Sequence, residues 1–222
     1  MLFDNYPKIR PKLPRDYVSS YNDYIIENRT GNNITNRIAR HLEGWMHRQV
    51  KKTYTSSEGK TLELGAGNLN HLEWEIGIDN YDIVEPNLDL LDHAEHDYKI
   101  NEKFSKVADI PSERQYDRII SIAVLEHMTD LPMEIALSAM HMSKQGKFCA
   151  GLPSEGGWLW EMAWKYGTGP AFKRRTGLDY SIIMQHEHVN SIDEIEKCID
   201  YFFDTVTIRR FPFPTKNTSF YK

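Results

Sequence analysis

The sequence contains only two cysteines, Cys149 and Cys198, among its 222 residues. Two cysteines cannot form the disulfide framework that stabilises many small secreted domains, and they are too few for a zinc site built on cysteine clusters. Such a pair is typical of free thiols in a reducing compartment. We therefore expect a cytoplasmic protein without disulfide bonds.

Long apolar runs and an excess of positive charge are also absent. No run approaches the ~20 apolar residues that a helix needs to cross a membrane. The stretch Met1–Asn5 lacks a basic segment followed by an apolar one, so we expect no signal peptide. The formal net charge of −5 argues against general affinity for nucleic acids. These absences favour a protein that neither inserts into a membrane nor binds nucleic acid.

The composition is that of a globular protein with a sizeable core. Hydrophobic residues make up 40% of the chain and charged residues 27%, as in soluble domains. A chain of 222 residues is long enough for one domain. We predict a single domain, 1–222, with an N-terminal arm and covering helix, a ligand-binding core, an insertion, and a C-terminal helix with strands. The arm and covering helix are residues 1–50, the ligand-binding core is 59–151, the insertion is 152–190, and the C-terminal helix with strands is 191–222.

The core contains five apolar runs, most of which end in an acidic or polar residue. The strands that they predict are Thr61–Leu64, Asp82–Val84, Phe104–Ala108, Arg118–Ala123 and Lys147–Gly151. Helical patterns alternate with them, which implies parallel strands joined by right-handed crossovers. The predicted fold class is therefore a doubly wound α/β fold, whose ligands bind at the carboxyl edge of the sheet.

Helices are predicted before, within and after this core. Apolar residues recur at helical spacing in Ile34–Val50 and in Leu131–Ser143. Ser191 and Glu194 have the spacing of a capping box and predict a further helix from that point. Beyond it we predict two strands, Thr205–Phe211 and Thr218–Tyr221.

The segment 152–190 interrupts the alternation. It is rich in glycine and tryptophan, and a long connection of this kind after a sheet strand predicts a substrate lid. Trp160 and Trp164 stand four residues apart, which indicates a short helix inside it. Glu155 and Asp179 are acids in this segment that could hold hydroxyl groups of a substrate.

A glycine turn follows the first predicted strand and carries the most specific signal. Gly65 and Gly67 allow tight curvature and let a ligand approach the main chain. A dinucleotide site would need a third glycine, yet position 70 is Asn70. Glu63, two residues before the first glycine, would also repel a pyrophosphate. The turn therefore favours a ligand that carries positive charge.

With Glu63-x-Gly65-x-Gly67 and a later Leu125-Glu126-His127, the chain resembles the class I S-adenosylmethionine-dependent methyltransferases of the small-molecule type. The resemblance covers roughly 59–151. It implies a mostly parallel seven-stranded sheet, Rossmann-like, with a terminal antiparallel strand. Many members carry a third glycine where this chain has Leu69.

The resemblance further implies that S-adenosylmethionine is the cofactor. Its sulfonium and ammonium groups would be attracted by Glu63. Glu85 offers two acceptor oxygens for the ribose hydroxyls. Asp109 would accept from the adenine amino group, and the backbone N–H of Ile110 would reach a ring nitrogen. The complete set of expected cofactor-binding residues is Glu63, Gly65, Ala66, Gly67, Glu85, Pro86, Asp109, Ile110, Ala123 and Arg37.

A second resemblance concerns the acceptor. The stretch Gly151–Gly157 and the later Glu187–Asn190 are similar to a subset of these enzymes found among bacterial surface-polysaccharide genes. This implies a small-molecule substrate, a sugar or nucleotide-sugar hydroxyl, and a role in polysaccharide biosynthesis. A homodimer is left open.

Three histidines are candidates for proton transfer. His127 follows the fourth strand, where donor and acceptor would meet, and its ordinary pKa of about 6.5 suits a general base. His186 and His188 would point to one face if they lay on a strand. They are too few for a metal site, and no further ligand motif accompanies them, so we expect no metal.

Two alternatives from other classes stay open at this point. A nicotinamide-dependent reductase would use the same kind of sheet edge, but the missing third glycine and Glu63 oppose it. A protein of the same fold could also bind the cofactor without catalysis, and sequence alone does not exclude that.

Overall fold

The computed structural model describes most of the chain. The described residues are 3–18, 20, 34–54, 59–75, 77–88, 91, 99–215 and 219–222. Within the first long helix, side chains are described from Glu43 onward. The predicted contact of Arg37 with the cofactor therefore lies outside the described residues, although its backbone is helical.

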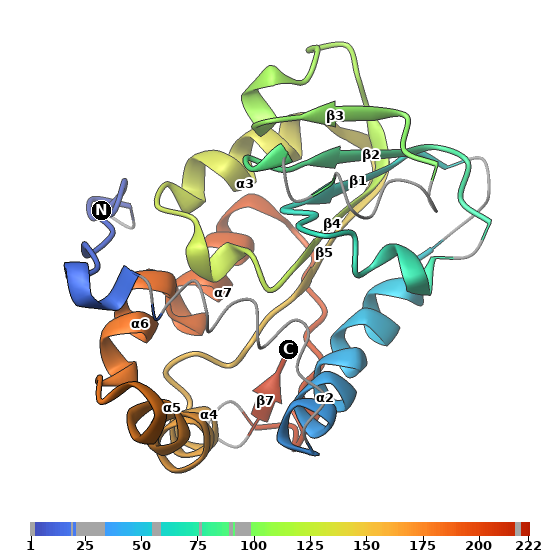
Figure 1. The fold of residues 1–222 in the computed structure, drawn as a ribbon. Coiled ribbons are helices and arrows are strands. Elements are labelled where there is room, and N and C mark those ends of the chain that lie inside the picture. Colours follow the sequence, from blue (N-terminus) through green and yellow to red (C-terminus); the bar gives the residue numbers. More distant parts are fainter. Residues whose placement is uncertain are drawn as a thin grey trace.

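Five parallel strands form the central sheet, in the order β3-β2-β1-β4-β5 (Figure 1). The strands are β1 Thr61–Leu64, β2 Tyr81–Val84, β3 Glu102–Phe104, β4 Tyr116–Ile122 and β5 Met142–Gly151. Every neighbouring pair is parallel, so all five carboxyl ends lie at one edge. The strand order reverses direction between β1 and β4, which is where ligands bind in open α/β sheets. The predicted α/β fold with a parallel sheet is confirmed.

The third strand is shorter than predicted and lies earlier in the chain. Only Glu102–Phe104 pair with β2, whereas Val107–Asp109 form a 3-10 turn, η4. The N–H of Ile110 donates to the Val107 carbonyl at 3.1 Å and closes that turn. The prediction of a strand over Phe104–Ala108 was therefore right only at Phe104 and wrong beyond it, because local bonds replace the ladder.

The junction between helix α3 and β5 also differs from the prediction. Helix α3 spans Leu131–Met140 and ends before the predicted bound at Ser143. Strand β5 begins two residues after the end of α3, at Met142. The N–H of Tyr116 donates to the His141 carbonyl at 2.8 Å, so pairing with β4 starts here. Gly146 lies inside β5, where an added Cβ would meet the Met142 side chain at 2.5 Å. This glycine therefore allows close packing within the strand.

Helices cover both faces of the sheet (Figure 1). Helix α2 (Ile34–Lys51) and the 3-10 turn η1 (Leu72–Trp74) lie on one face, and α3 and α7 (Ile192–Phe202) lie on the other. Neighbouring residues of β4 point to opposite faces: Ile120 joins the cluster on the α2 side, and Ile119 joins the opposite cluster. Both side chains are fully buried. The sheet is therefore doubly wound.

Helix α7 begins where the sequence predicted. The Ser191 side chain accepts from the N–H of Glu194, and the Glu194 carboxylate accepts from the N–H of Ser191 at 2.8 Å. This reciprocal capping box satisfies donors that a helix N-terminus otherwise leaves unpaired. The predicted cap is confirmed.

The insertion folds into a helical unit with its own apolar cluster. Its elements are α4 Trp158–Ala163, the π-helix η6 Trp164–Thr168, α5 Gly169–Thr176 and α6 Tyr180–Glu187. Phe172, Tyr180 and Ile183 are buried together with Tyr17 of the N-terminal arm. His186 lies on α6 and His188 caps its C-terminus, so the two do not lie on a strand and do not share a face in that way. The Asp179 carboxylate accepts from the Ser181 N–H at 2.9 Å and caps α6.

The C-terminal strands form a separate antiparallel pair. Strand β6 (Phe211–Pro212) pairs with β7 (Ser219–Tyr221), as the prediction of a terminal antiparallel strand requires. Residues 205–210 are neither helix nor strand, so the predicted strand there is reduced to its end. Leu152 and Lys222 exchange two backbone hydrogen bonds of 2.8 Å beside the end of β5. A single seven-stranded sheet is not confirmed among the described residues.

No helix in the described part of the chain is both long and apolar enough to span a membrane.

Candidate active site

The glycine turn after β1 adopts the conformation that its sequence predicts. Gly65 and Gly67 have φ values of +64° and +54°, a region that favours glycine. An added Cβ at Gly65 would lie 2.5 Å from a methyl carbon of Val124, so the turn packs tightly against the end of β4. At Gly67 an added Cβ would meet nothing within 4 Å. The turn is therefore closed at one glycine and open at the other, where a ligand can approach the main chain.

Leu69, where many members of the family that the chain resembles carry glycine, has a left-handed backbone conformation. Its φ is +63°, and its side chain is only 1% exposed in the core on the α2 side. A branched residue in this conformation carries backbone strain. The residue therefore fills the core in a conformation that favours glycine.

Glu85 joins the loops that follow β1 and β2. Its Oε2 accepts from the N–H of Gly67 at 2.8 Å, and its Oε1 accepts from the N–H of Asn87 at 2.8 Å. The side chain is buried, whereas the adjacent Pro86 is exposed. A carboxylate has about four lone-pair sites, so each oxygen keeps capacity for one more donor. Glu85 is thus fixed in position and can still accept from two hydroxyl groups.

Glu63 lies beneath this turn in a fully buried position on β1. The Tyr81 hydroxyl donates to its Oε2 at 2.8 Å. Burial raises the pKa of Glu63 to about 8, and the neighbouring Glu75 contributes in the same direction. Glu63 is therefore mostly protonated at neutral pH, and a cation that arrives beside it would favour the carboxylate.

The other predicted cofactor contacts occupy less enclosed positions. Asp109 is exposed, with Lys106 Nζ at 3.6 Å from its Oδ1. The N–H of Ile110 is already engaged in the η4 turn, so it is not free to meet a ring nitrogen without a rearrangement. The N–H of Ala66 donates to the Val84 carbonyl at 3.3 Å. Ala123 has a φ of +53° and turns the chain away from the end of β4.

His127 lies at the carboxyl end of β4 in the 3-10 turn η5 (Leu125–His127). Its Nδ1 lies 2.7 Å from the Glu187 carbonyl oxygen. A carbonyl only accepts, so Nδ1 carries the proton and the lone pair of the neutral ring is on Nε2. Burial lowers the pKa of His127, and the nearby His188 lowers it further. The ring is therefore neutral at pH 7, with Nε2 available to accept a proton.

His188 stands against His127, with ring centroids 4.9 Å apart and the planes at 74°. Its Nδ1 hydrogen-bonds the Glu155 carboxylate, which also accepts from Trp160 Nε1 at 2.6 Å. Glu126 completes the group: its Oε1 is 3.9 Å from His127 Nε2, and burial raises its pKa to about 7. The structure thus brings two of the three candidate histidines into one cluster.

His186 lies outside this cluster's hydrogen bonds. Its Nδ1 bonds the Pro11 carbonyl oxygen at 2.6 Å, which fastens α6 to the N-terminal arm. Arg10 of the same arm donates to the carbonyls of His127 and His186. Sequence reasoning missed this role of the arm, because nothing in the arm's local pattern indicates which distant carbonyls it reaches.

A buried polar network on the α2 face was also missed. His47 Nδ1 lies 3.0 Å from His71 Nδ1, and His71 Nε2 lies 2.8 Å from Glu75 Oε1. Arg118 pairs with the same carboxylate at 2.8 Å. Burial, followed by the proximity of His71, lowers the pKa of His47 to about 4. These contacts attach α2 and η1 to the sheet below the glycine turn. Within the described residues, no group of three or more ligating side chains could hold a metal ion.

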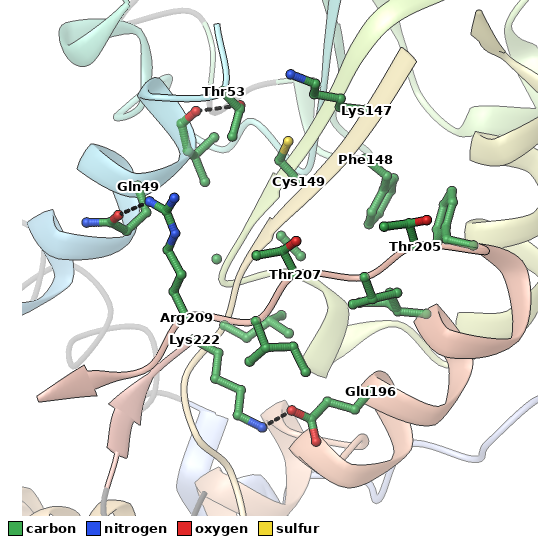
Figure 2. A pocket seen from close by; sticks show the side chains of 18 of the residues that line it. Gln49, Thr53, Lys147, Phe148, Cys149, Glu196, Thr205, Thr207, Arg209 and Lys222 are labelled. Carbon is green, nitrogen blue, oxygen red and sulfur yellow. Dashed lines mark hydrogen bonds and ion pairs between the residues drawn. The ribbon is translucent and has the colours of Figure 1, made fainter. Parts of the chain in front are cut away.

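A cavity of about 820 Å³ lies beside β5, the last strand of the sheet (Figure 2). Helix α2, α7 and residues 203–209 form its other walls. Arg209 donates to Gln49 at 3.0 Å across one side, and Lys222 pairs with Glu196 at another. None of the predicted site residues lines this cavity. The candidate site is therefore the carboxyl edge of the sheet instead.

Comparisons with known proteins agree with this arrangement at the level of the fold. No protein-family model and no curated protein matches the sequence. Among solved structures, the plantazolicin methyltransferase BpumL, in complex with a pentazolic desmethylPZN analog and SAH, is similar with a TM-score of 0.57 and 14% identity. That match covers 84% of this chain and 69% of BpumL.

A methyltransferase from Clostridium acetobutylicum ATCC 824, described as S-adenosylmethionine-dependent, matches with a TM-score of 0.44 and 15% identity. It covers 66% of this chain, which spans 61% of that protein's length. The likeness to BpumL and the parallel sheet order together identify the fold. The chain has the fold of the S-adenosylmethionine-dependent methyltransferases.

Proposed function

We propose that the protein transfers a methyl group from S-adenosylmethionine to a small molecule. The observation that carries this proposal is the convergence of the open glycine turn, Glu85 and His127 at one edge of the sheet. BpumL, which shares the fold, is described in complex with SAH.

The residues at the edge fit this cofactor. Open space at Gly67 admits a ligand against the main chain, and the fixed carboxylate of Glu85 accepts the two ribose hydroxyls. Asp109 accepts from the adenine amino group, and Glu63 becomes ionised when a cation lies above it. The remaining members of the set are Gly65, Ala66, Pro86, Ile110, Ala123 and Arg37.

The bound cofactor would supply an electrophilic methyl group on a sulfonium. Positioning and exclusion of water then provide most of the rate. The acceptor hydroxyl would lose its proton to Nε2 of His127 as its oxygen takes the methyl group, and the sulfonium would leave as the neutral thioether of S-adenosylhomocysteine. The Glu187 carbonyl holds the ring in the tautomer that this step needs.

The acceptor class that we propose is a sugar or nucleotide-sugar hydroxyl, used in the cytoplasm for surface-polysaccharide synthesis. Support comes from the resemblance at Gly151–Gly157 and Glu187–Asn190, and from the neutral His127 ring, whose Nε2 can accept a hydroxyl proton. His186 is the secondary candidate for the base, because the hydrogen bond to Glu155 favours the protonated form of His188. A cofactor-binding protein without catalysis is the remaining alternative, and a nicotinamide-dependent reductase is not favoured.

The first test is ligand choice in a thermal-unfolding assay. S-Adenosylhomocysteine at millimolar excess should raise the melting temperature, because a ligand that binds only the folded state stabilises it by mass action. NADH and NADPH should leave it unchanged. The same protein should then release S-adenosylhomocysteine from S-adenosylmethionine when nucleotide sugars are supplied.

Stabilisation by NADH and not by S-adenosylhomocysteine would overturn the cofactor proposal. Binding without turnover on any hydroxyl acceptor would instead favour the non-catalytic alternative.

A further inference from the structure

The two ends of the insertion meet at Glu155, whose carboxylate bonds His188 and whose backbone carbonyl accepts from the N–H of Ile192 at 3.2 Å. Glu155 lies just after β5, before the first helix of the insertion, and His188 immediately follows the last helix, α6. His188 Nδ1 bonds Glu155 Oε1, so the pair closes the neck of a helical unit that leaves and re-enters the fold here. Trp160 Nε1 bonds the same oxygen at 2.6 Å and fixes the carboxylate from inside the insertion.

This neck adjoins the proposed base. The His188 ring packs edge-to-face on His127 at 4.9 Å between centroids. The side chains of Glu155 and His188 are 14% and 17% exposed, so water screens their charges weakly. A charge on one imidazole at this distance opposes protonation of the other.

We propose that Glu155 and His188 are positioning residues for His127: Glu155 holds His188 as an imidazolium, and that charge keeps the adjacent His127 neutral and able to accept a proton. The inference rests on the proposed function, since His127 is the base proposed there. The insertion thus contributes a charge to the site as well as a cover for it.

The directions of the pKa shifts agree with this division of roles. Burial alone would lower the pKa of His188, but its hydrogen bond to Glu155 and the charges of Glu155 and Glu126 raise it above the ordinary value. The pKa of His127 is lowered, by burial first and by His188 second. The pKa values of the two neighbouring histidines are therefore shifted in opposite directions, which is the pattern by which acid and base roles are separated.

Other charged groups around the pair come from every neighbouring element. Glu187 of α6 lies 3.6 Å from His127 Nδ1 and favours its protonation, whereas Arg10 of the arm opposes it. Glu126 of η5 faces both rings, and Glu43 of α2 acts on Glu126. Within this set, Glu155 is the group that hydrogen-bonds His188 and does not face His127 directly.

A purely structural role is the rival explanation, in which the pair only fastens the neck. His188→Gln separates the two. The Gln amide can still donate to Glu155, so the neck keeps a hydrogen bond, but the side chain carries no charge. Glu155→Gln removes the carboxylate while keeping an acceptor. Glu161→Gln is the matched control, because Glu161 pairs with Lys165 on an exposed part of the same insertion.

The experiment is an NMR titration of the histidine rings in the full chain, without cofactor or acceptor. In the native protein, His188 should titrate above its ordinary pKa and His127 below. In His188→Gln and in Glu155→Gln, the pKa of His127 should rise by about one unit. In Glu161→Gln it should not move.

An unchanged His127 titration in folded His188→Gln would overturn the inference and leave the neck as a structural contact. If Glu155→Gln does not fold, His188→Gln alone decides. S-Adenosylhomocysteine binding, measured on the same samples, reports separately on the proposed function. Its absence from the native protein would end that function without affecting the titration result.

Discussion

At the scale of single residues, the site depends on atoms that are already engaged before a ligand binds. Glu85 bonds two backbone N–H groups, and Glu63 accepts from Tyr81. Leu69 holds a backbone conformation suited to glycine because burial of its side chain offsets the strain. Preformed contacts of this kind reduce the ordering that binding would otherwise require.

Replacement of Glu85 tests the ribose contact. Glu85→Ala should weaken S-adenosylhomocysteine binding by about one to two orders of magnitude, roughly 1.5–3 kcal/mol, because charge-assisted hydrogen bonds are lost. Glu85→Gln should lose less, since it keeps one acceptor oxygen. Calorimetric titration measures both.

Glu113→Gln is the control, because Glu113 is an exposed acid away from the turn. Circular dichroism of the Glu85 variants must show that they fold without the bonds that Glu85 makes to the N–H groups of Gly67 and Asn87. Equal affinities in both Glu85 variants and the native protein would place Glu85 outside the site.

At the scale of elements, the insertion has an apolar cluster of its own. Its helices share a cluster centred on Phe172, Tyr180 and Ile183, to which, among the described residues, the N-terminal arm alone adds from elsewhere. Its connections to the core include the bond from the His127 ring to the Glu187 carbonyl and those from the N–H groups of Val189 and Asn190 to the Glu126 carbonyl. A unit with its own small core can open without unfolding the sheet, as a lid requires.

Ile183→Ala should loosen this unit selectively. Ile183 is fully buried, and such a truncation costs about 2–5 kcal/mol in a packed cluster. Limited proteolysis should then cut within 156–187 faster than in the native protein, while S-adenosylhomocysteine affinity stays within about threefold.

Ile135→Ala, in the cluster under α3, provides the contrast. It should lower the global melting temperature without a preferred cut in the insertion. Identical cleavage patterns in the two variants would mean that the insertion and the core unfold together.

At the scale of the whole molecule, buried ionisable groups determine how stability depends on pH. The pKa of Glu63 is raised to about 8 and that of Glu126 to about 7, both chiefly by burial, and the pKa of His188 is also raised. A raised pKa means that the folded protein holds a proton that the unfolded chain has released. The stability from these groups is complete at low pH and is lost as pH rises through the folded pKa values.

We therefore predict that the free energy of unfolding falls by about 1–3 kcal/mol between pH 6.5 and pH 8. His47 and His127 have lowered pKa values, so in the unfolded chain they are about half protonated at pH 6.5 whereas in the folded protein they are mostly neutral. Each therefore opposes the trend by only a few tenths of a kcal/mol, at the lower end of the range. Urea unfolding at several pH values measures it.

Glu63→Gln should flatten the curve, because the amide keeps an acceptor for Tyr81 without a titrating proton. A slope that Glu63→Gln leaves intact would assign the pH dependence to other groups.

The sequence by itself determined the elements whose signals are local. The bounds of β1, the turn at Gly65 and Gly67, and the cap at Ser191 are set by neighbouring residues, through alternation, backbone freedom and short-range hydrogen bonds. Helix α2 and the parallel order followed in the same way, because helical periodicity and alternating elements leave few topologies. The prediction of the third strand was wrong beyond Phe104, because Val107–Asp109 form a 3-10 turn with local hydrogen bonds instead of pairing with the distant strand β2.

Only the tertiary structure decided the surroundings of His127. Its ring bonds the Glu187 carbonyl, 60 residues away, its carbonyl receives Arg10, 117 residues away, and His188 reaches Glu155 across 33 residues. No periodicity or spacing encodes such pairs, because each depends on how the insertion and the arm pack onto the edge of the sheet. The sequence identified the histidines as candidates for proton transfer. The packing of distant segments decided which nitrogen of His127 can accept a proton and which neighbouring residue carries charge.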